Sequence, residues 1–377
     1  MGVLHLLRVY NLFYFSVLAI FLSFLPLYLA GRGISPAEIG LMVGVGSFIG
    51  ILSQPFWGMI SDKYKTIKTV ILLTLGISIV VGSVLFQSAG ALRLLILVGL
   101  MYFFLLPTDP LTESLNYRIS ERHGVSFGAI RMFGAIGYAA ASLLVGYAVE
   151  YLGMGSLSYL FLGFGFLTIV VCLFLPDAPA VAKPISFADL KRFFTYRKTI
   201  WFFLLVLIAA TPHRTNDNFL GVFIQSLGGS AGMVGQAWFF AAVSEVVFFA
   251  WSGRWMRPGT EIKLITLAAA VYAVRYTLCY LVTDPQWVVW LQLLQGITFA
   301  VFYSASIQYL YRMIPEEWRA TGQTVLAVVF FGISGIVGSL VGGWVFHAFG
   351  GSQLYLLMAA VSLASCLFSL ALWKDNA

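Results

Sequence analysis

The stretch YRISERHGVSFG, residues 117–128, decides the fold, because it stands between two long apolar runs and has a counterpart later in the chain. The counterpart is YRMIPEEWRATG at 311–322, offset by 194 residues, with the same Tyr-Arg start and the same final Gly. Further on, LVG at 144–146 matches LVG at 340–342 at an offset of 196. The sequence therefore indicates two similar halves arranged as a parallel repeat.

Apolar runs extend on both sides of these stretches along nearly the whole chain. The 377 residues are 60% hydrophobic and 10% charged, whereas soluble domains carry about 25% charged residues. A run of about 20 apolar residues can cross a hydrocarbon core of roughly 30 Å as a helix. The sequence predicts an all-α integral membrane protein with twelve spans, at 10–30, 36–60, 67–88, 92–117, 127–152, 156–175, 198–226, 232–254, 262–282, 286–312, 320–346 and 352–373.

The basic residues of the connections predict the orientation. Of the 22 Lys and Arg residues, 17 fall in connections on the side of the two termini and two, Arg32 and Arg93, fall on the other side. Because positive residues concentrate on the cytoplasmic side of membrane proteins, both termini are expected in the cytoplasm, in a bacterial cytoplasmic membrane. The net charge of +7 then reflects topology and gives no reason to expect nucleic-acid binding.

One long polar connection, about 176–197, divides the spans six and six. We expect an N-terminal six-helix half at 1–180, a cytoplasmic linker at 181–197 and a C-terminal six-helix half at 198–377. Two halves in parallel repeat place a cavity at their interface near the membrane midplane, where alternating-access transporters bind substrate.

The connection after the second span, GMISDKYK at 58–65, resembles the signature loop of the major facilitator superfamily. The resemblance implies the major facilitator fold and a conformational-gating loop with Gly58, Asp62 and Lys63, in which the small residue permits close helix approach and the charges latch the halves. A second glycine of the pattern would fall near position 65, which is Lys here. The matching connection of the other half, at 252–257, has small and basic residues without the aspartate.

Small residues recur inside the spans. Glycines in transmembrane helices let backbones approach closely, and structural packing explains the stripes Gly40, Gly44 and Gly50 in span 2 and Gly332, Gly335, Gly338 and Gly342 in span 11. The three cysteines lie in three different spans without metal-type spacing. We interpret them as packing residues, and no metal or cofactor is expected.

Ionisable residues inside the spans are the candidate functional residues, because each costs roughly 2.5 kcal/mol or more at the bilayer centre. Counting 1.5 Å per residue along a helix places Glu113 and Arg131 at similar depth, so they are expected to meet. The same counting places Glu245 and Arg275 near the midplane, where they are also expected to meet. The remaining candidates are Asp109, flanked by prolines, and the pair Arg214 and Asp217, which share a helical face beside a Pro212-His213 step that suggests a broken outer turn.

Two regions resemble the lactose permease family of oligosaccharide:proton symporters. DPLTESLNYRISERHGVSFGAIRMFGAIGY, residues 109–138, is similar to its span 4–5 region. The resemblance implies that Glu113 and Arg131 bind sugar hydroxyls and that Tyr138, where the relatives have Trp, stacks on the sugar ring. VSEVVFFAWSG and AVRY are similar to the span 8–9 region of that family and of the 3-phenylpropionate transporters, which implies a substrate and coupling acid, Glu245, with its partner Arg275.

Span 10 departs from that pattern. The lactose permease relatives carry His and Glu there for proton coupling, whereas this chain has Gln292, Gln295 and Gln308. A transported proton must therefore be carried by a carboxylate elsewhere, which we expect to be Glu245, then Asp217, then Glu113. Asp109, Arg214 and Gln295 are expected to line the cavity. For each charged pair, a purely structural role in holding helices together is the alternative.

Other classes of membrane protein find less support. The sequence contains no arrangement of a nucleophile and its base that would indicate an enzyme. It also contains no G-x-x-x-x-G-K-[ST] stretch that would indicate ATP-driven transport. The sequence favours a monomeric secondary transporter that moves a small solute with protons by alternating access. A sugar or oligosaccharide is the favoured solute, and the alternatives are an aromatic carboxylate such as 3-phenylpropionate, which arginine can bind as a fork, or a nucleoside. A transporter-fold sensor or regulatory protein is the alternative from a different class.

Overall fold

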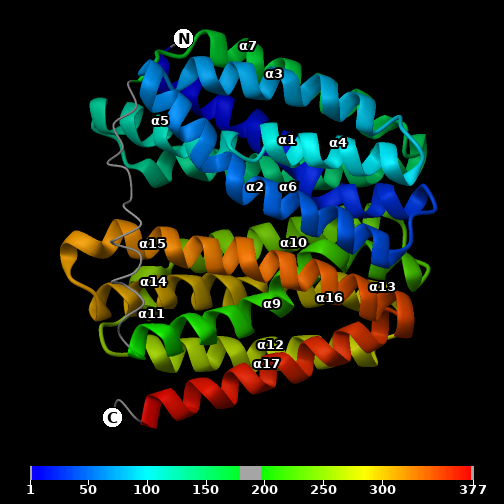
Figure 1. Cartoon of the computed structure of the whole chain (residues 1–377), viewed down its shortest axis with the longest axis vertical. Helices are drawn as coiled ribbons and strands as arrows, with labels where there is room; N and C mark the ends of the chain where they lie inside the picture. Colours follow the sequence, from blue (N-terminus) through cyan, green and yellow to red (C-terminus); the bar gives the residue numbers. More distant parts are fainter. Residues whose placement is uncertain (1, 179–196, 375–377) are drawn as a thin grey trace.

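The structure, a computed structural model, describes residues 2–178 and 197–374. Within these residues the chain is helical, and its helices form two bundles that lie one above the other in Figure 1. α1 begins and α17 ends at the same side of the bundles in that view. The all-helical prediction is confirmed. Residues 181–196 of the expected linker lie outside the described residues, so the boundaries of the two halves stay a prediction.

The N-terminal bundle contains six crossings of the molecule. α4 and α5 form one of them, with a break at 105–107 inside the predicted span 92–117, beside the prolines that flank Asp109. Its helices are α1 (Val3–Gly31), α2 (Pro36–Tyr64), α3 (Lys68–Leu85), α4 (Ala91–Phe104), α5 (Thr108–Arg122), α6 (Phe127–Leu152) and α7 (Ser156–Leu173).

The C-terminal bundle repeats this order with more irregular helices. α13 and α14 form one crossing through a 3-10 turn and a π turn, and α15 and α16 form another through a π turn. Its helices are α9 (Arg197–Ser226), α10 (Ala231–Ala250), α11 (Ser252–Trp255), α12 (Glu261–Leu281), α13 (Pro285–Leu291), α14 (Val301–Met313), α15 (Arg319–Ala327), α16 (Ser334–Phe349) and α17 (Gly351–Lys374). The repeated stretches 117–128 and 311–322 occupy corresponding connections, between α5 and α6 and between α14 and α15.

Eleven helical crossings of the described chain are long and apolar enough to span a membrane. α9 is not among them, although its 30 residues give it sufficient length. The polar run at 212–218, in the middle of α9, lowers its hydropathy, and the same run brings charged side chains to the centre of the molecule. The order of the helices still matches the twelve predicted spans.

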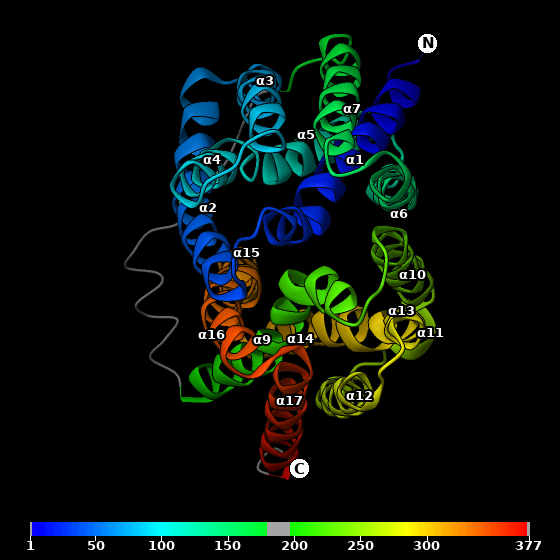
Figure 2. The ribbon, with the colours of Figure 1, turned by 90° about the vertical axis from the view of Figure 1, so that its right-hand side faces the viewer.

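The two bundles are closed against each other at the end opposite the termini, which we call the outer end. A Cβ on Gly40 of α2 would lie 2.2 Å from the Ser339 carbonyl oxygen of α16. A Cβ on Gly146 of α6 would lie 2.8 Å from the Cα of Gly235 in α10. Figure 2 shows these two pairs, α2 with α16 and α6 with α10, lying side by side. Glycine is therefore required at these crossings for backbone contact between the bundles.

A carboxylate strengthens the closed outer end. Glu150, near the end of α6, accepts hydrogen bonds from the Ser230 hydroxyl at 2.7 Å and from the Gly232 backbone N–H at 2.9 Å. Both donors belong to the start of α10 in the other bundle, where the free N–H groups and the helix dipole favour a negative charge. Opening the outer end requires these bonds to break.

The inner end of α2 is different. Gly58 has no heavy atom within 4 Å of the place where a Cβ would lie. The close helix approach expected at Gly58 is therefore absent in this conformation, because the bundles meet at the outer end instead.

At position 65, where the signature pattern has its second glycine, the loop backbone adopts a conformation that favours glycine. Lys65 ends α2 in the left-handed conformation at φ 53° and ψ 37°, and it is the one non-glycine residue with positive φ in the described chain. Asp177, which follows α7, binds the next residues of this loop: its carboxylate accepts bonds from the backbone N–H groups of Ile67 and Lys68 and from the Thr66 hydroxyl. Burial would raise the pKa of Asp177, but these bonds outweigh burial and hold its pKa below the ordinary value.

Replacing Lys65 by Gly is expected to stabilise the protein by about 0.5–1 kcal/mol, because a left-handed conformation costs a residue with a Cβ more than it costs glycine. The thermal unfolding midpoint in detergent measures the change. Lys63→Gly is the matched control, since Lys63 lies inside the last turn of α2, where glycine is expected to lower the midpoint. A lower midpoint for Lys65→Gly would show that the loop backbone carries no such cost.

Replacing Glu150 by Ala is expected to shift the protein about tenfold towards conformations with an open outer end, because charge-assisted hydrogen bonds to α10 are lost. The readout is labelling of Val43→Cys, a buried cavity position, by an impermeant maleimide added from the outer side of oriented vesicles. Glu38→Gln is the control, because the hydrogen bonds of Glu38 stay at the start of its own helix. Equal labelling of all variants would contradict a latching role for Glu150.

Candidate functional site

Glu113 and Arg131 meet in the N-terminal bundle, as their depth predicted. Arg131 Nε lies 2.6 Å from Glu113 Oε1, which joins α6 to α5. The Arg131 guanidinium also lies over the Phe15 ring of α1, 3.9 Å from its centroid. The side chains of Arg131 and Glu113 are 39% and 27% exposed, so the pair faces open space rather than a sealed core. The second oxygen of Glu113, Oε2, has no hydrogen-bond partner within the described residues.

A polar ladder between α1 and α5 holds Glu113 in position. Three side chains of α5 at four-residue spacing, on one face of the helix, bond to α1. The bonds are Tyr14–Thr108 at 2.9 Å, Tyr10–Thr112 at 2.7 Å and Asn11–Asn116 at 2.7 Å. Asp109 and Glu113 each follow a ladder residue by one position, which turns them away from α1. Asp109 lies in the first turn of α5, just after the break, and its Oδ1 is buried without a partner within 2–178 and 197–374.

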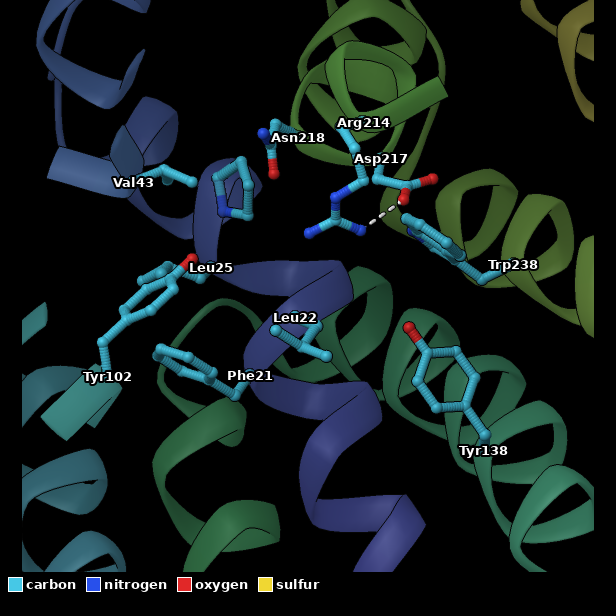
Figure 3. A pocket seen from close by; sticks show the side chains of 11 residues that line it. Phe21, Leu22, Leu25, Val43, Tyr102, Tyr138, Arg214, Asp217, Asn218 and Trp238 are labelled. Atoms are coloured by element: carbon cyan, nitrogen blue, oxygen red, sulfur yellow. Dashed lines mark hydrogen bonds and ion pairs between the residues drawn. The ribbon is translucent and has the colours of Figure 1, made fainter. Parts of the chain in front are cut away.

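A pocket lies near the centre of the molecule, between the two bundles (Figure 3). Aromatic and aliphatic side chains form most of its wall, and α9 contributes a polar edge. The lining residues are Phe21, Leu22, Leu25, Pro26, Val43, Tyr102, Tyr138, Arg214, Asp217, Asn218 and Trp238. Tyr138, Arg214 and Asp217 are sequence-predicted residues, whereas Asn218 and Trp238 were missed.

The polar edge is built on an ion pair. Arg214 Nη1 donates to Asp217 Oδ2 at 2.7 Å, and Figure 3 shows the guanidinium lying between Asn218 and Trp238. Opposite this edge, the Tyr138 ring packs edge-on against Trp238, with centroids 6.3 Å apart. Arg214 Nε, Asp217 Oδ1 and Trp238 Nε1 have no hydrogen-bond partner in the described chain. Two donors and one acceptor are therefore free beside aromatic faces.

The broken outer turn expected beside this pair is absent. α9 continues from Arg197 to Ser226 through Pro212. His213 is 3% exposed and stacks on Phe299, with ring centroids 4.8 Å apart. Its Nε2 lies 3.5 Å from Asp217 Oδ2, so Asp217 contacts both His213 and Arg214. Tertiary packing of His213 keeps this segment helical where the sequence suggested a hydrated break.

The direct contact expected between Glu245 and Arg275 is not made. Arg275 of α12 is fully buried and has no acidic group within 4 Å in the described chain. Its guanidinium donates to the side-chain oxygens of Gln292 and Gln295 and, at 3.2 Å, to the Thr298 hydroxyl. The expected direct pairing is not found, because depth places residues along the membrane normal but does not say towards which neighbour a side chain turns.

Irregular backbone in the tenth crossing explains this arrangement. The 3-10 turn Gln292–Leu294 is followed by the π turn Gly296–Ala300. Residues 292, 295 and 298 are three apart, and the turns bring all three side chains to Arg275. Gln292 and Thr298 were missed as partners of Arg275, although their three-residue spacing around Gln295 was visible in the sequence.

The predicted gating-loop residues are distant in sequence from the residues that line the pocket, and they do not line it. Gly58 and Asp62 lie in the last two turns of α2, and Lys63 Nζ lies 5.6 Å from the centroid of the neighbouring Tyr64 ring. Glu113, Arg131, Glu245, Arg275, Asp109 and Gln295 are also absent from the pocket lining. Across 2–178 and 197–374, no group of three His, Cys, Asp or Glu side chains has the arrangement of a metal site.

The MFS_1 like family model matches residues 4–357. The chain is 27% identical over 373 residues to the maltose permease of Geobacillus stearothermophilus, with 97% of this chain and 94% of that one covered. It is 26% identical over 360 residues to the probable 3-phenylpropionic acid transporter of Escherichia coli (strain K12), with 93% of each covered. Its fold is similar to the crystal structure of the nucleoside transporter NupG, with a TM-score of 0.89, 16% identity and coverage of 99% of this chain and 100% of that one.

Proposed function

The chain belongs to the MFS_1 like family of membrane transporters, and from that premise we propose that it moves a small organic solute together with protons by alternating access, with a sugar or oligosaccharide as the favoured solute. The pocket between the bundles is the observation that carries this proposal. It combines aromatic walls with a polar edge of Arg214, Asp217 and Asn218. Sugars need both features, because their ring faces pack on aromatic rings and their hydroxyls donate and accept hydrogen bonds.

The charges around the cavity favour a neutral solute over a carboxylate. Arg214 is already paired with Asp217, and Arg131 is already paired with Glu113. Arg275, which has no paired acid in the described chain, is fully buried. A carboxylate in the pocket would therefore meet the Asp217 charge without a free arginine fork to bind it. An aromatic carboxylate is therefore a less favoured solute than a sugar.

A nucleoside is the second candidate. Four aromatic residues line the pocket, Phe21, Tyr102, Tyr138 and Trp238, and their ring faces suit a flat base as well as a sugar. The similarity in fold to NupG, a nucleoside transporter, is the observation that favours it. A base would use the free donors and acceptor of the polar edge in the same way as sugar hydroxyls.

Glu113 and Arg131 lie on the proposed path of the solute towards the inner side. Arg131 precedes Tyr138 by seven residues on α6, about 10 Å along the helix axis, in the direction of the inner end. The pair is partly exposed, and Glu113 Oε2, although buried in this conformation, has no hydrogen-bond partner in the described chain. We assign this pair to the outer rings of an oligosaccharide or to solute leaving the pocket.

Glu245 is the proposed proton carrier. Glu113 and Asp217 each have an arginine nitrogen within 2.7 Å and are engaged in ion pairs. Glu245 has no such ion pair within the described residues, and it lies in the second half of α10. A carboxyl group without a directly paired cation gains and loses a proton more easily in a low-dielectric site.

Replacing Asp217 by Asn is expected to weaken solute binding about tenfold or more, because one charged acceptor is lost from the polar edge. The measurement is binding and uptake by purified protein in liposomes with a panel of disaccharides, nucleosides and 3-phenylpropionate. Asp284→Asn is the matched control, because Asp284 caps α13 outside the pocket and Asn caps equally well. Tight binding of phenylpropionate alone would overturn the preference for a neutral solute.

Replacing Glu245 by Gln is expected to abolish solute-driven acidification of the liposome interior while solute exchange across the membrane continues. The reason is that exchange needs no net proton movement, whereas accumulation needs a group that carries the proton. An internal pH dye and isotope counterflow measure the two activities on the same preparation. Acidification at the wild-type rate in Glu245→Gln would assign the proton to another carboxylate.

A further inference from the structure

Arg275 is a fully buried cation held by neutral groups. Its guanidinium donates to the amide oxygens of Gln292 and Gln295 and to the Thr298 hydroxyl, all from the tenth crossing. An isolated charge away from water is costly, and neutral acceptors offset only part of that cost. A nearby negative charge would offset more.

The two glutamine amides are used differently. Gln292 Nε2 donates to the Val288 carbonyl at 2.9 Å, so this amide bonds back to its own crossing. Gln295 also gives its oxygen to Arg275, which turns its NH2 group to the opposite side.

Backbone contact places Glu245 next to Gln295. The Gly296 N–H donates to the Ser244 hydroxyl at 3.0 Å, and a Cβ on Gly296 would lie 2.5 Å from the Ser244 carbonyl oxygen. Glu245 and Gln295 are the immediate neighbours of these two residues. The Gln295 side chain is therefore a polar group of the tenth crossing beside Glu245, and it acts on the charge of the Glu245 carboxylate.

We propose that Gln295 is a positioning residue that connects the Glu245 carboxylate to Arg275 through a single amide. In this arrangement the oxygen of the amide accepts from the cation and its NH2 group donates to the anion. Each bond polarises the other and strengthens it. The inference deepens the proposed proton symport and rests on it for the role of Glu245.

The Gln295 amide limits the routes by which a proton can reach Glu245. A glutamine amide does not ionise, so no proton passes between Glu245 and Arg275 through Gln295. The proton must reach Glu245 from the cavity side. When it arrives, the carboxyl group loses its charge, and the buried Arg275 loses its nearby counter-charge. Protonation of Glu245 on α10 therefore changes the electrostatic surroundings of Arg275 on α12 and of its partners in the tenth crossing.

Other charged or titratable groups also act on Glu245. On the helices packed against α10 they are Arg214 and Asp217 of α9 and Arg131 and Tyr138 of α6, and Arg275 acts from α12. None of them contacts Gln295 except Arg275, so far as the described residues show. Variants of Gln295 therefore change the connection and leave the other charges in place.

The test is an infrared titration of full-length protein in lipid, which follows the C=O band of the protonated Glu245 carboxyl group, assigned with Glu245→Gln. In Gln295→Met we expect the midpoint to move upwards by about one pH unit, because the charged carboxylate loses a donor. Gln292→Met is the matched control, because it also removes one acceptor from Arg275 but leaves Glu245 bonded. Its midpoint is expected to stay at the wild-type value.

Equal shifts in the two variants, or no shift in Gln295→Met, would overturn the connection. If Gln295→Met does not fold, Gln295→Asn tests the same point, because it retracts the amide by one methylene and is expected to raise the midpoint too. Solute-driven acidification is measured on the same wild-type preparation. Its absence together with the expected infrared shift would refute proton symport and leave the connection standing, whereas acidification without the shift would do the reverse.

Discussion

The structure depends on one constraint, which is that every charge placed inside a hydrocarbon layer must find a partner within the protein. The three arginines inside the spans meet it in three ways. Arg131 bonds to a carboxylate on the next helix, Arg214 bonds to one on its own helix, and Arg275 bonds to two amides and a hydroxyl. These bonds fix α5 against α6 and α12 against the tenth crossing, while the Arg214–Asp217 pair forms the polar edge of the pocket.

Backbone contact at the outer end is the second determinant. Gly40 and Gly146 let helices of the two bundles touch, and Glu150 adds charged hydrogen bonds to the start of α10. Van der Waals contact between glycines is short-ranged and strong only at full closure. Such an interface separates without leaving large apolar side chains unpacked, which suits a transporter that must open and close the same end repeatedly.

Much of the fold could be predicted because membrane crossing leaves a one-dimensional signal. The apolar runs, the repeat at 117–128 and 311–322, and the meeting of Glu113 with Arg131 all depend on distance along a helix. The errors have a common cause as well. Trp238 was missed because one aromatic residue among many carries no sign of which way it faces. Glu245 was paired directly with Arg275 because depth does not reveal that Arg275 turns towards Gln295.

The sequence by itself determined the order of the crossings, the repetition of the first half by the second, and the set of charges that the membrane interior must accommodate. Only the tertiary structure decided which partner each charge has, which aromatic side chains form the pocket and which end of the molecule is closed. The physical reason is that hydrophobicity and helical rise act along the chain. Rotation of each helix about its axis, and the π and 3-10 turns that alter that rotation at 292–300, depend on packing between helices.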